Sequence, residues 1–317
     1  MTDINQAIAS LSWQREPQGL YAPIAYALEG GGKRLRPTLA MIACRMYDGD
    51  EQKALPVALA LEIFHNFTLL HDDVMDQAPV RRGRPTVHVK WDDNTAILSG
   101  DQMMTEAYIQ LETVDPALLP QVLHLFNGMA EDIWRGQQLD MEFEKREDVT
   151  LDEYLEMIRL KTSVLLGTAL QMGSLVSGAP EKDRQLLYRI GERLGLAFQI
   201  QDDVLDVWGD PATFGKRIGG DIVQNKKSAV QLLALMHANE AQHRALTEWL
   251  HRTDFDEEEK IREVTALYNE IQIRPLCEQM TAGYTEEAMR DISQLSVPEQ
   301  KKEELIGIAR KLLNRKN

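Results

Sequence analysis

Apolar positions along the chain recur at intervals of three and four residues, as they do on one face of an α-helix. Two such series are Leu28, Leu35, Leu39 and Ile42, and Leu155, Ile158, Leu165 and Leu166. The spacing of Thr150 with Glu153, and of Ser296 with Glu299, is that of the helix-starting capping box. Strand-like alternation is nearly absent, so the pattern predicts an all-α protein.

Two segments interrupt the helical pattern. Residues 78–86 read APVRRGRPT, and residues 209–225 are rich in Gly, with Lys226 and Lys227 directly after them. We find neither a linker rich in Ser, Gly and Pro nor an internal repeat. We therefore expect residues 1–317 to form one domain, with the motifs that carry chemistry within 28–230 and surface helices over 237–317.

Composition narrows the classes of partner. The 317 residues include 50 acidic and 35 basic side chains, a net charge of −15, which argues against general binding to nucleic acid or anionic membranes. Cys44 and Cys277 form neither a disulfide framework nor a zinc motif and favour a reducing, cytoplasmic setting. No signal-type start and no long uncharged apolar run are present, so we expect no transmembrane helix.

Three carboxylates end the apolar run IFHNFTLLH, namely Asp72, Asp73 and Asp76. On a helix Asp72 and Asp76 share a face, at the end where the helix dipole is negative. Such an arrangement is unfavourable unless cations neutralise it, and hard oxygen ligands suit Mg²⁺. The alternative is a solvated acidic helix end.

The same triplet recurs as Asp202, Asp203 and Asp206, again after an apolar run, LAFQIQ. Each triplet is followed by a basic, non-helical segment. This repetition favours two Mg²⁺ sites over two solvated helix ends.

Basic residues form three clusters against this acidic background: Lys33, Arg34 and Arg36; Arg81, Arg82 and Arg84; and Lys216, Lys226 and Lys227. Taken singly, each cluster is typical of a solvated surface. Together with two Mg²⁺ sites they indicate a cavity for more than one diphosphate, because guanidinium groups match phosphate oxygens. The apolar helix before Asp72 would hold a hydrocarbon tail.

The ordered motifs resemble those of the trans-isoprenyl diphosphate synthases, or polyprenyl synthetases. The matching segments are GGKRLRP, HNFTLLHDDVMD with RRGRPTVH, GQQLD at 136–140, KT at 161–162, FQIQDDVLD at 198–206, and GK, GGD and NKKS within 215–228. The last matching segment, with Asn225 and Ser228, differs from the G-K-x-T that is more common in the family. The resemblance implies an isoprenoid-synthase-type helical bundle around a central cavity, and a homodimer.

The resemblance also implies residue roles. Mg²⁺ would be bound by Asp72, Asp73, Asp76, Asp202, Asp203 and Asp206. The allylic diphosphate would be held by Arg81, Lys161, Lys216 and Lys226, and isopentenyl diphosphate by Lys33, Arg36, His65 and Arg82. Thr162 and Gln199 would line the reacting region, and Gln137 and Asp140 would brace helices or order metal-bound water. Taken alone, a histidine on an apolar helix such as His65 is more often a core residue.

Product length is expected to depend on side chains that block the hydrocarbon tail along the first acidic helix. Phe67 and Phe64 lie about 7 and 12 Å up the helix axis from Asp72, and Thr68 follows Phe67 in place of a second aromatic. This pattern resembles geranylgeranyl synthases and favours a C15 to C20 product, C20 above C15. The alternative is that Phe67 is ordinary core.

Two other functions compete with this interpretation. A class I terpene cyclase is also helical and Mg²⁺-dependent, but the second acidic triplet and GGKRLRP argue against it. A non-catalytic subunit of a heteromeric synthase typically loses these aspartates, whereas all six are present here.

Overall fold

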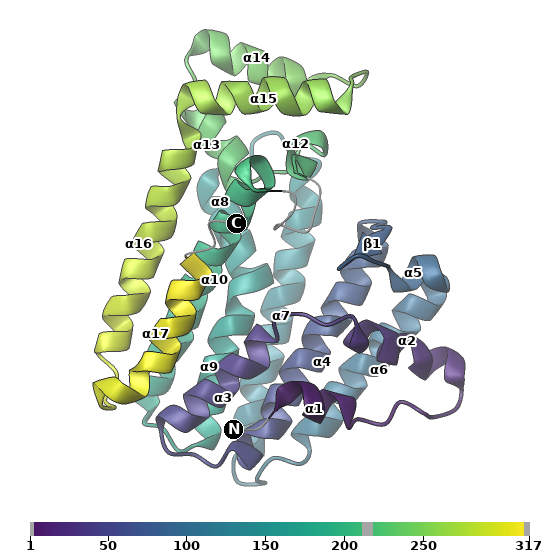
Figure 1. The fold of residues 1–317 in the computed structure, drawn as a ribbon, viewed down its shortest axis with the longest axis vertical. Coiled ribbons are helices and arrows are strands. Elements are labelled where there is room, and N and C mark those ends of the chain that lie inside the picture. The colour runs from purple at the N-terminus through teal and green to yellow at the C-terminus, as the bar shows by residue number, and fades with distance from the viewer. Residues whose placement is uncertain (1–2, 211–217, 314–317) are drawn as a thin grey trace. The chain divides into compact units, whose positions relative to one another are not determined.

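The computed structural model describes residues 3–210 and 218–313, and this part of the chain is almost entirely helical (Figure 1). Its elements are α1 (Ile4–Ala9), α2 (Gln18–Glu29), α3 (Leu35–Met46), α4 (Glu51–Met75), β1 (Val80–Arg81), β2 (Arg84–Pro85), α5 (Val87–Lys90), α6 (Asp93–Leu111), α7 (Leu119–Phe143), α8 (Leu151–Ile158), the π-helical turn η1 (Arg159–Ser163), α9 (Val164–Val176), α10 (Glu181–Trp208), α12 (Gly220–Val223), α13 (Ala229–His237), α14 (Glu240–His251), α15 (Glu257–Ile271), α16 (Ile273–Ser293) and α17 (Glu299–Leu313). The predicted all-α fold is confirmed.

The chain divides into two compact units. The first comprises the described residues up to Gly128 together with Thr168–Tyr188 and Ser296–Lys302. The second comprises Met129–Gly167, Arg189–Leu295 and the described residues from Glu303 onward. The expectation of a single domain stays a prediction.

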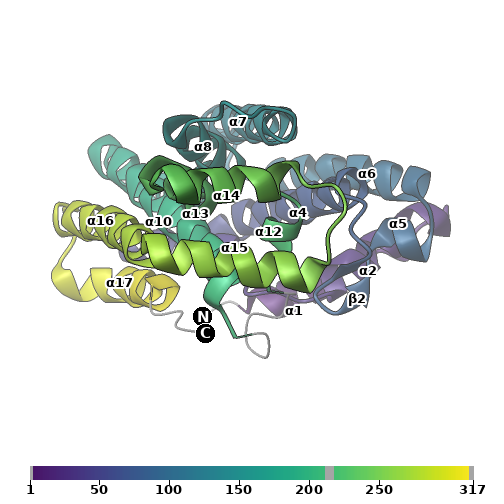
Figure 2. The same ribbon diagram turned by 90° about the horizontal axis from the view of Figure 1, so that it is seen from above.

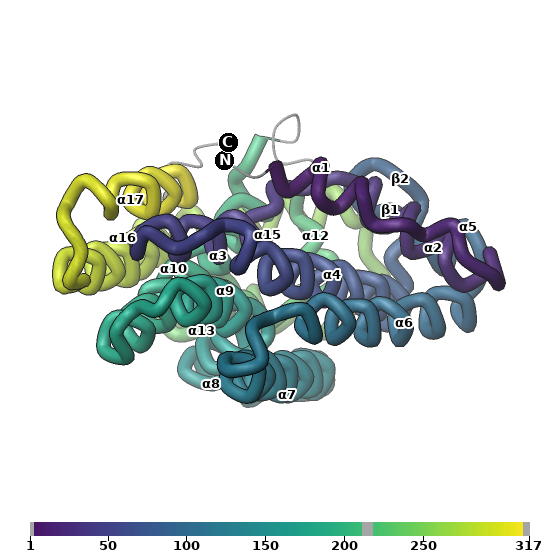
Figure 3. Tube along the Cα trace, turned by 90° about the horizontal axis from the view of Figure 1, so that it is seen from below, coloured from purple at the N-terminus to yellow at the C-terminus, as the bar shows by residue number. Residues whose placement is uncertain are grey.

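Helix α4 is the centre of the first unit. It packs most extensively against α6 and then against α3, and Figure 3 shows α4 and α6 running alongside each other. Asp50 caps its start by accepting a hydrogen bond from the Gln52 amide. By length and composition α4 could cross a membrane, but 72% of its apolar window is buried, as in a core helix. The long helix therefore forms the core that carries the first acidic triplet at its C-terminal end.

In the second unit, the core is formed where α8, the C-terminal part of α10, α13, α15 and α16 meet. Fully buried members include Ile200, Ala229, Ile273 and Cys277. Helices α14 and α15 run side by side above α13 (Figure 2). These helices belong to the segment expected to be a surface cluster, yet they contribute Leu246, Val264 and Tyr268 to this core.

The two predicted capping boxes have different outcomes. Thr150 and Glu153 form the reciprocal box at the start of α8, as predicted. Ser296 does not cap a helix, because α17 begins only at Glu299. Its backbone amide and hydroxyl instead donate to the buried carboxylate of Asp183.

Candidate active site

The first acidic triplet lies at the C-terminal end of α4. Asp72 is half-buried and Asp76 is exposed, whereas Asp73 is only 5% exposed. The Asp73 carboxylate accepts a hydrogen bond of 2.8 Å from Nε of Arg81. Burial raises the pKa of Asp73 above its ordinary value, while the Arg81 guanidinium acts in the opposite direction. Asp73 thus holds the neighbouring arginine, and Asp72 and Asp76 face the more accessible side.

The basic segment after α4 forms a tight hairpin. Val80 pairs with Pro85 and Arg81 with Arg84, so Arg82 and Gly83 are its two turn residues. Both have positive φ, 53° and 74°, as a type I′ turn requires. The Arg82 guanidinium donates to the carbonyl oxygen of Gly31 in the basic loop before α3.

The three cations at this loop and the start of α3 differ in burial. Arg34 has a left-handed backbone, φ 47°, and a buried side chain. Its guanidinium donates to Oε1 of Glu62 and to the carbonyl oxygen of Leu28, each at 2.6 Å. Lys33 is exposed and Arg36 is half-buried. Arg34 is therefore an internal brace, which leaves Lys33 and Arg36 as the candidate substrate contacts.

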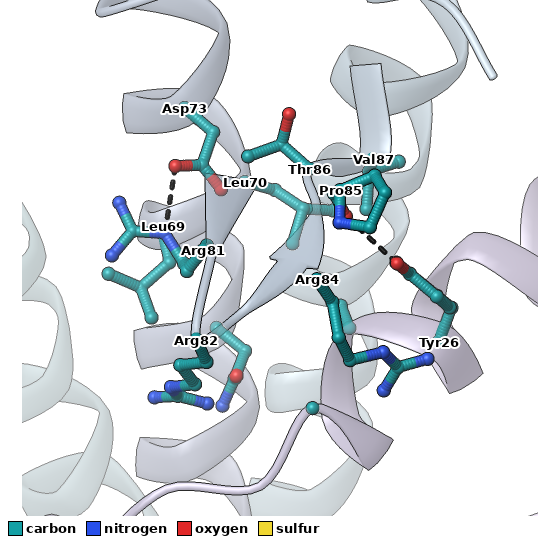
Figure 4. A pocket seen from close by; sticks show the side chains of 13 residues that line it. Tyr26, Leu69, Leu70, Asp73, Arg81, Arg82, Arg84, Pro85, Thr86 and Val87 are labelled. Carbon is teal, nitrogen blue, oxygen red and sulfur yellow. Dashed lines mark hydrogen bonds and ion pairs between the residues drawn. The ribbon is translucent and has the colours of Figure 1, made fainter. Parts of the chain in front are cut away.

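A pocket lies between the end of α2, α4 and the hairpin (Figure 4). Its lining includes Asp73, Arg81, Arg82, Arg84 and Tyr26. The Arg84 guanidinium lies 3.9 Å from the centre of the Tyr26 ring, and the Tyr26 hydroxyl donates to the Pro85 carbonyl at 2.9 Å. Sequence reasoning did not single out Tyr26. Its signal, a cation–π contact with the hairpin, is visible only in three dimensions.

His65 of α4 is half-buried and feels the charges of four nearby arginines. Burial lowers its pKa well below the ordinary value, and the charges of Arg36, Arg82, Arg81 and Arg34 lower it further. The imidazole is therefore neutral at pH 7, with one nitrogen able to donate and the other to accept.

The candidate product-length residues lie on α4. Phe64 is fully buried and Phe67 is 6% exposed, with ring centres 5.6 Å apart. Phe64 also contacts Phe126, and Phe67 contacts His71. The Thr68 hydroxyl donates to the His65 carbonyl of its own helix. The aromatic side chains thus form a continuous cluster before Asp72.

The second acidic triplet lies near the end of α10, and here both the second and the third aspartate are buried. Asp202 is half-buried, whereas Asp203 and Asp206 are 5% and 7% exposed. Oδ2 of Asp203 accepts from the Tyr154 hydroxyl and from the Ala229 amide at 2.8 Å, and Gln199 donates to Oδ1 at 3.4 Å. Burial, followed by the charge of Asp221, raises the pKa of Asp203.

Asp206 extends this pattern to the segment that follows. Its Oδ2 accepts from the Asp221 amide at 3.0 Å, and its backbone oxygen accepts from the Gly219 amide at 2.6 Å. Asp73, Asp203 and Asp206 thus all accept hydrogen bonds from protein donors. Their predicted roles as metal ligands stay predictions.

Lys161 and Thr162 lie on η1, a single π-helical turn between α8 and α9. The Lys161 ammonium pairs with Asp140 of α7 at 2.5 Å. Helix α7 approaches closely because residue 136 is glycine: a Cβ there would lie 2.4 Å from the Lys161 backbone nitrogen. The sequence predicted roles for Lys161 and Thr162 but did not predict the π-turn that carries them. This turn breaks the regular helical hydrogen bonding at a candidate catalytic lysine.

The last predicted motif, NKKS at 225–228, lies between α12 and α13. Lys226 follows Asn225, whose φ is 55°, and the Lys226 amide donates to the Asp221 carbonyl at 2.9 Å. The Ser228 side chain caps α13 by accepting from the Gln231 amide. Lys216, the other lysine predicted here, lies outside the described residues.

Comparison with known proteins connects these motifs. The family model of polyprenyl synthetase matches residues 17–268. The chain belongs to the polyprenyl synthetase family. A geranylgeranyl diphosphate synthase of Methanosarcina mazei is 39% identical over 233 residues, which are 73% of this chain and 72% of that protein. A short chain isoprenyl diphosphate synthase of Methanocaldococcus jannaschii is 39% identical over 76% of this chain and 73% of its own.

A solved structure of a geranylgeranyl pyrophosphate synthase is similar to this polyprenyl synthetase over the whole of both chains, with a TM-score of 0.93 and 40% identity. The fold is therefore that of the isoprenyl diphosphate synthases, and the chain is a trans-prenyltransferase. Of the two competing functions, neither the cyclase nor the non-catalytic subunit fits these relatives.

The donor chemistry of this polyprenyl synthetase can be tested against Mg²⁺. Among the described residues, no three acidic, histidine or cysteine side chains are gathered closely enough to enclose a metal ion. Mg²⁺ usually takes one or two carboxylates and completes its shell with water and substrate phosphate oxygens. Asp72, Asp76 and Asp202 are the more accessible carboxylates of the triplets, so the residues fit an ion that arrives with a diphosphate.

Proposed function

We propose that this polyprenyl synthetase condenses isopentenyl diphosphate with dimethylallyl, geranyl or farnesyl diphosphate, and that its product is a C15 to C20 prenyl diphosphate, with geranylgeranyl diphosphate favoured. The observation that carries this proposal is the paired arrangement of acidic and basic groups. The first acidic helix end has the accessible carboxylates of Asp72 and Asp76 and lies beside the Arg81–Arg84 hairpin, and the second has the half-buried carboxylate of Asp202 and lies beside the segment with Lys226. The geranylgeranyl diphosphate synthases among the similar proteins support the C20 product.

The reaction needs no protein nucleophile. The allylic C–O bond breaks to leave a carbocation and diphosphate, the isopentenyl double bond attacks the cation, and a proton passes to the departing diphosphate. Asp72 and Asp76 at the first acidic helix end, and Asp202 at the second, would offer carboxylates to Mg²⁺, which would neutralise charge at the leaving group. Lys161, Lys226 and Arg81, with Lys216, hold the allylic diphosphate, and their positive charges stabilise the charge that develops on it.

Isopentenyl diphosphate is proposed to bind at the basic residues around the start of α3 and the hairpin, of which Arg82 also lines the pocket of Figure 4. Lys33, Arg36 and Arg82 bind its diphosphate. Neutral His65 accepts or donates a hydrogen bond there without adding a fourth repelling charge. Thr162 and the Gln199 carbonyl direct weak dipoles toward the carbocation.

Phe67 is proposed as the floor that stops the growing chain, with Phe64 behind it. Phe67 is the outer of the two rings, and the Thr68 hydroxyl is bound along its own helix axis. One aromatic barrier at this depth suits a C20 tail better than two adjacent ones.

We also propose a cytoplasmic homodimer in which residues 1–317 act as one catalytic domain. Cys44 and Cys277 are both buried and free, as expected in a reducing compartment. On α6, Leu98 and Ile109 are 59% and 40% exposed and lie about three helical turns apart on one face. We take these two exposed apolar side chains, which have Gln102 and Thr105 between them, as candidate contacts with a partner subunit. Sedimentation of the Leu98→Asp variant as a monomer is the expected result.

The activity is tested by incubating the purified chain with labelled isopentenyl diphosphate, Mg²⁺ and each allylic primer, and identifying the products by chromatography. We expect a C20 diphosphate and loss of turnover when EDTA removes Mg²⁺. Cyclised hydrocarbon made from one allylic diphosphate, or no incorporation with any primer, would contradict the proposal.

A further inference from the structure

A buried lysine that is distant in sequence from the predicted motifs contacts the segment that carries Lys226. Lys260, in the first turn of α15, is 1% exposed. Its ammonium donates to Oδ1 of Asn225 at 2.7 Å and to the Val223 carbonyl at 3.3 Å. It also lies 4.2 Å from the centre of the Phe255 ring. A buried charge is costly unless it is fully hydrogen-bonded, so these contacts fix the lysine in place.

Asn225 converts this contact into a defined backbone position. Its φ of 55° is in the left-handed region, where asparagine is one of the few tolerated non-glycine residues. Its amide nitrogen donates to the Leu250 carbonyl, the last turn of α14, at 3.0 Å. Since an ammonium only donates and a carbonyl only accepts, these two partners fix the orientation of the Asn225 amide. Helices α14 and α15 therefore hold the residue immediately before Lys226.

The space around Lys260 does not suggest a ligand of its own. The cavity that it lines with Asn225, Trp249 and Tyr268 holds about 10 Å³, room for one water molecule. Burial lowers the pKa of the lysine below its ordinary value. Its hydrogen bonds go to the backbone carbonyl of Val223 and the side chain of Asn225.

We infer that Lys260 is a positioning residue for the allylic diphosphate site, acting through Asn225 to set the direction of Lys226. The inference rests on the proposed function, in which Lys226 binds that diphosphate. It assigns a part in substrate binding to the C-terminal helices and explains why this chain has asparagine at the start of NKKS: the site needs a left-handed residue that accepts from Lys260 and donates to Leu250.

The test uses Lys260→Met, which keeps the length of the side chain, Asn225→Gly, which keeps access to positive φ, and the double variant. Arg262→Met is the matched control, an exposed position on the same helix. Steady-state kinetics with farnesyl diphosphate and with isopentenyl diphosphate separate the two sites. Melting temperature and circular dichroism report folding.

We expect each single variant to raise KM for farnesyl diphosphate roughly tenfold, the effect of one lost positioning hydrogen bond, with KM for isopentenyl diphosphate unchanged. Because Lys260 acts through Asn225, the double variant should lie within about twofold of Asn225→Gly alone. An unchanged KM for farnesyl diphosphate in either single variant, equal rises in both KM values, or effects that multiply in the double variant would overturn the inference.

If Lys260→Met does not fold, Asn225→Gly decides by the same criterion. The wild-type protein separates the two proposals. No turnover by the wild type refutes the proposed function, whereas wild-type turnover with unaffected variants refutes only the role of Lys260.

Discussion

Replacing Gly136 by alanine tests whether the close approach of α7 to η1 positions Lys161, the candidate catalytic lysine. The added Cβ would lie 2.4 Å from the backbone nitrogen of Lys161, where ordinary contact begins at 3.4 Å, so the two segments must separate by about 1.0 Å (3.4 − 2.4). Both partners are backbone within helices, and neither can rotate away as a side chain could. The Asp140–Lys161 ion pair, at 2.5 Å, joins the same two segments and would be stretched.

The expected cost has two parts. Overpacking of this kind destabilises by about 1–3 kcal/mol. A misplacement of about 1 Å in a catalytic group lowers the rate roughly 100-fold. Product formation from farnesyl and isopentenyl diphosphates should therefore show kcat/KM reduced by about two orders of magnitude, well beyond what partial unfolding explains at the assay temperature.

Gly128→Ala is the matched control on the same helix, because a Cβ at residue 128 meets no atom within 4 Å. Alanine is favoured over glycine in a helix by about 1 kcal/mol, so this variant should melt at a higher temperature with unchanged kinetics. Wild-type kinetics for Gly136→Ala would refute the argument that this contact sets the position of Lys161.

Three further predictions concern other parts of the site. Phe67→Ala should lengthen the product beyond C20 by chromatography, and an unchanged length would show that Phe67 is not the floor. Asp203→Leu should lower the free energy of unfolding by about 2–6 kcal/mol, because the Tyr154 hydroxyl and the Ala229 amide lose their acceptor, and Asp203→Asn should cost less in the same melts. Since the folded pKa of His65 is depressed, the unfolded chain binds more protons below pH 6.5, so stability should fall as pH drops through that value and His65→Gln should reduce the slope.

The helical fold and the positions of the motifs were predictable from the sequence because both are local. The three-and-four spacing of apolar residues predicts helices wherever it recurs, and Thr150 with Glu153 forms its capping box from neighbouring residues alone. Ser296 shows the limit of this reasoning. Its hydroxyl has the same local options, but Asp183, 113 positions away, offers a buried acceptor that the local pattern cannot reveal.

The direction in which each charged side chain points was not predictable in the same way. Lys33, Arg34 and Arg36 are similar in the sequence, yet the left-handed backbone of Arg34 turns its guanidinium inward to Glu62. Lys260 did leave a signal that was overlooked. It occupies the same helical stripe as the buried Val264 and Tyr268, four and eight residues later, so a lysine there had to be buried.

In both acidic triplets the second aspartate is buried and accepts hydrogen bonds from the protein, and the helix geometry explains why. Successive residues are turned by about 100°, so the second aspartate of each triplet cannot face the same side as the first. Asp73 turns inward and binds Arg81 of the hairpin, while Asp203 turns inward and binds the Ala229 amide at the end of the segment that carries Lys226. In each unit the buried carboxylate thus fixes the cation-bearing segment beside its own acidic helix end. On this reasoning the second aspartate of each DDxxD sequence places the neighbouring basic segment, while the first aspartate, predicted to bind metal, stays on the accessible side.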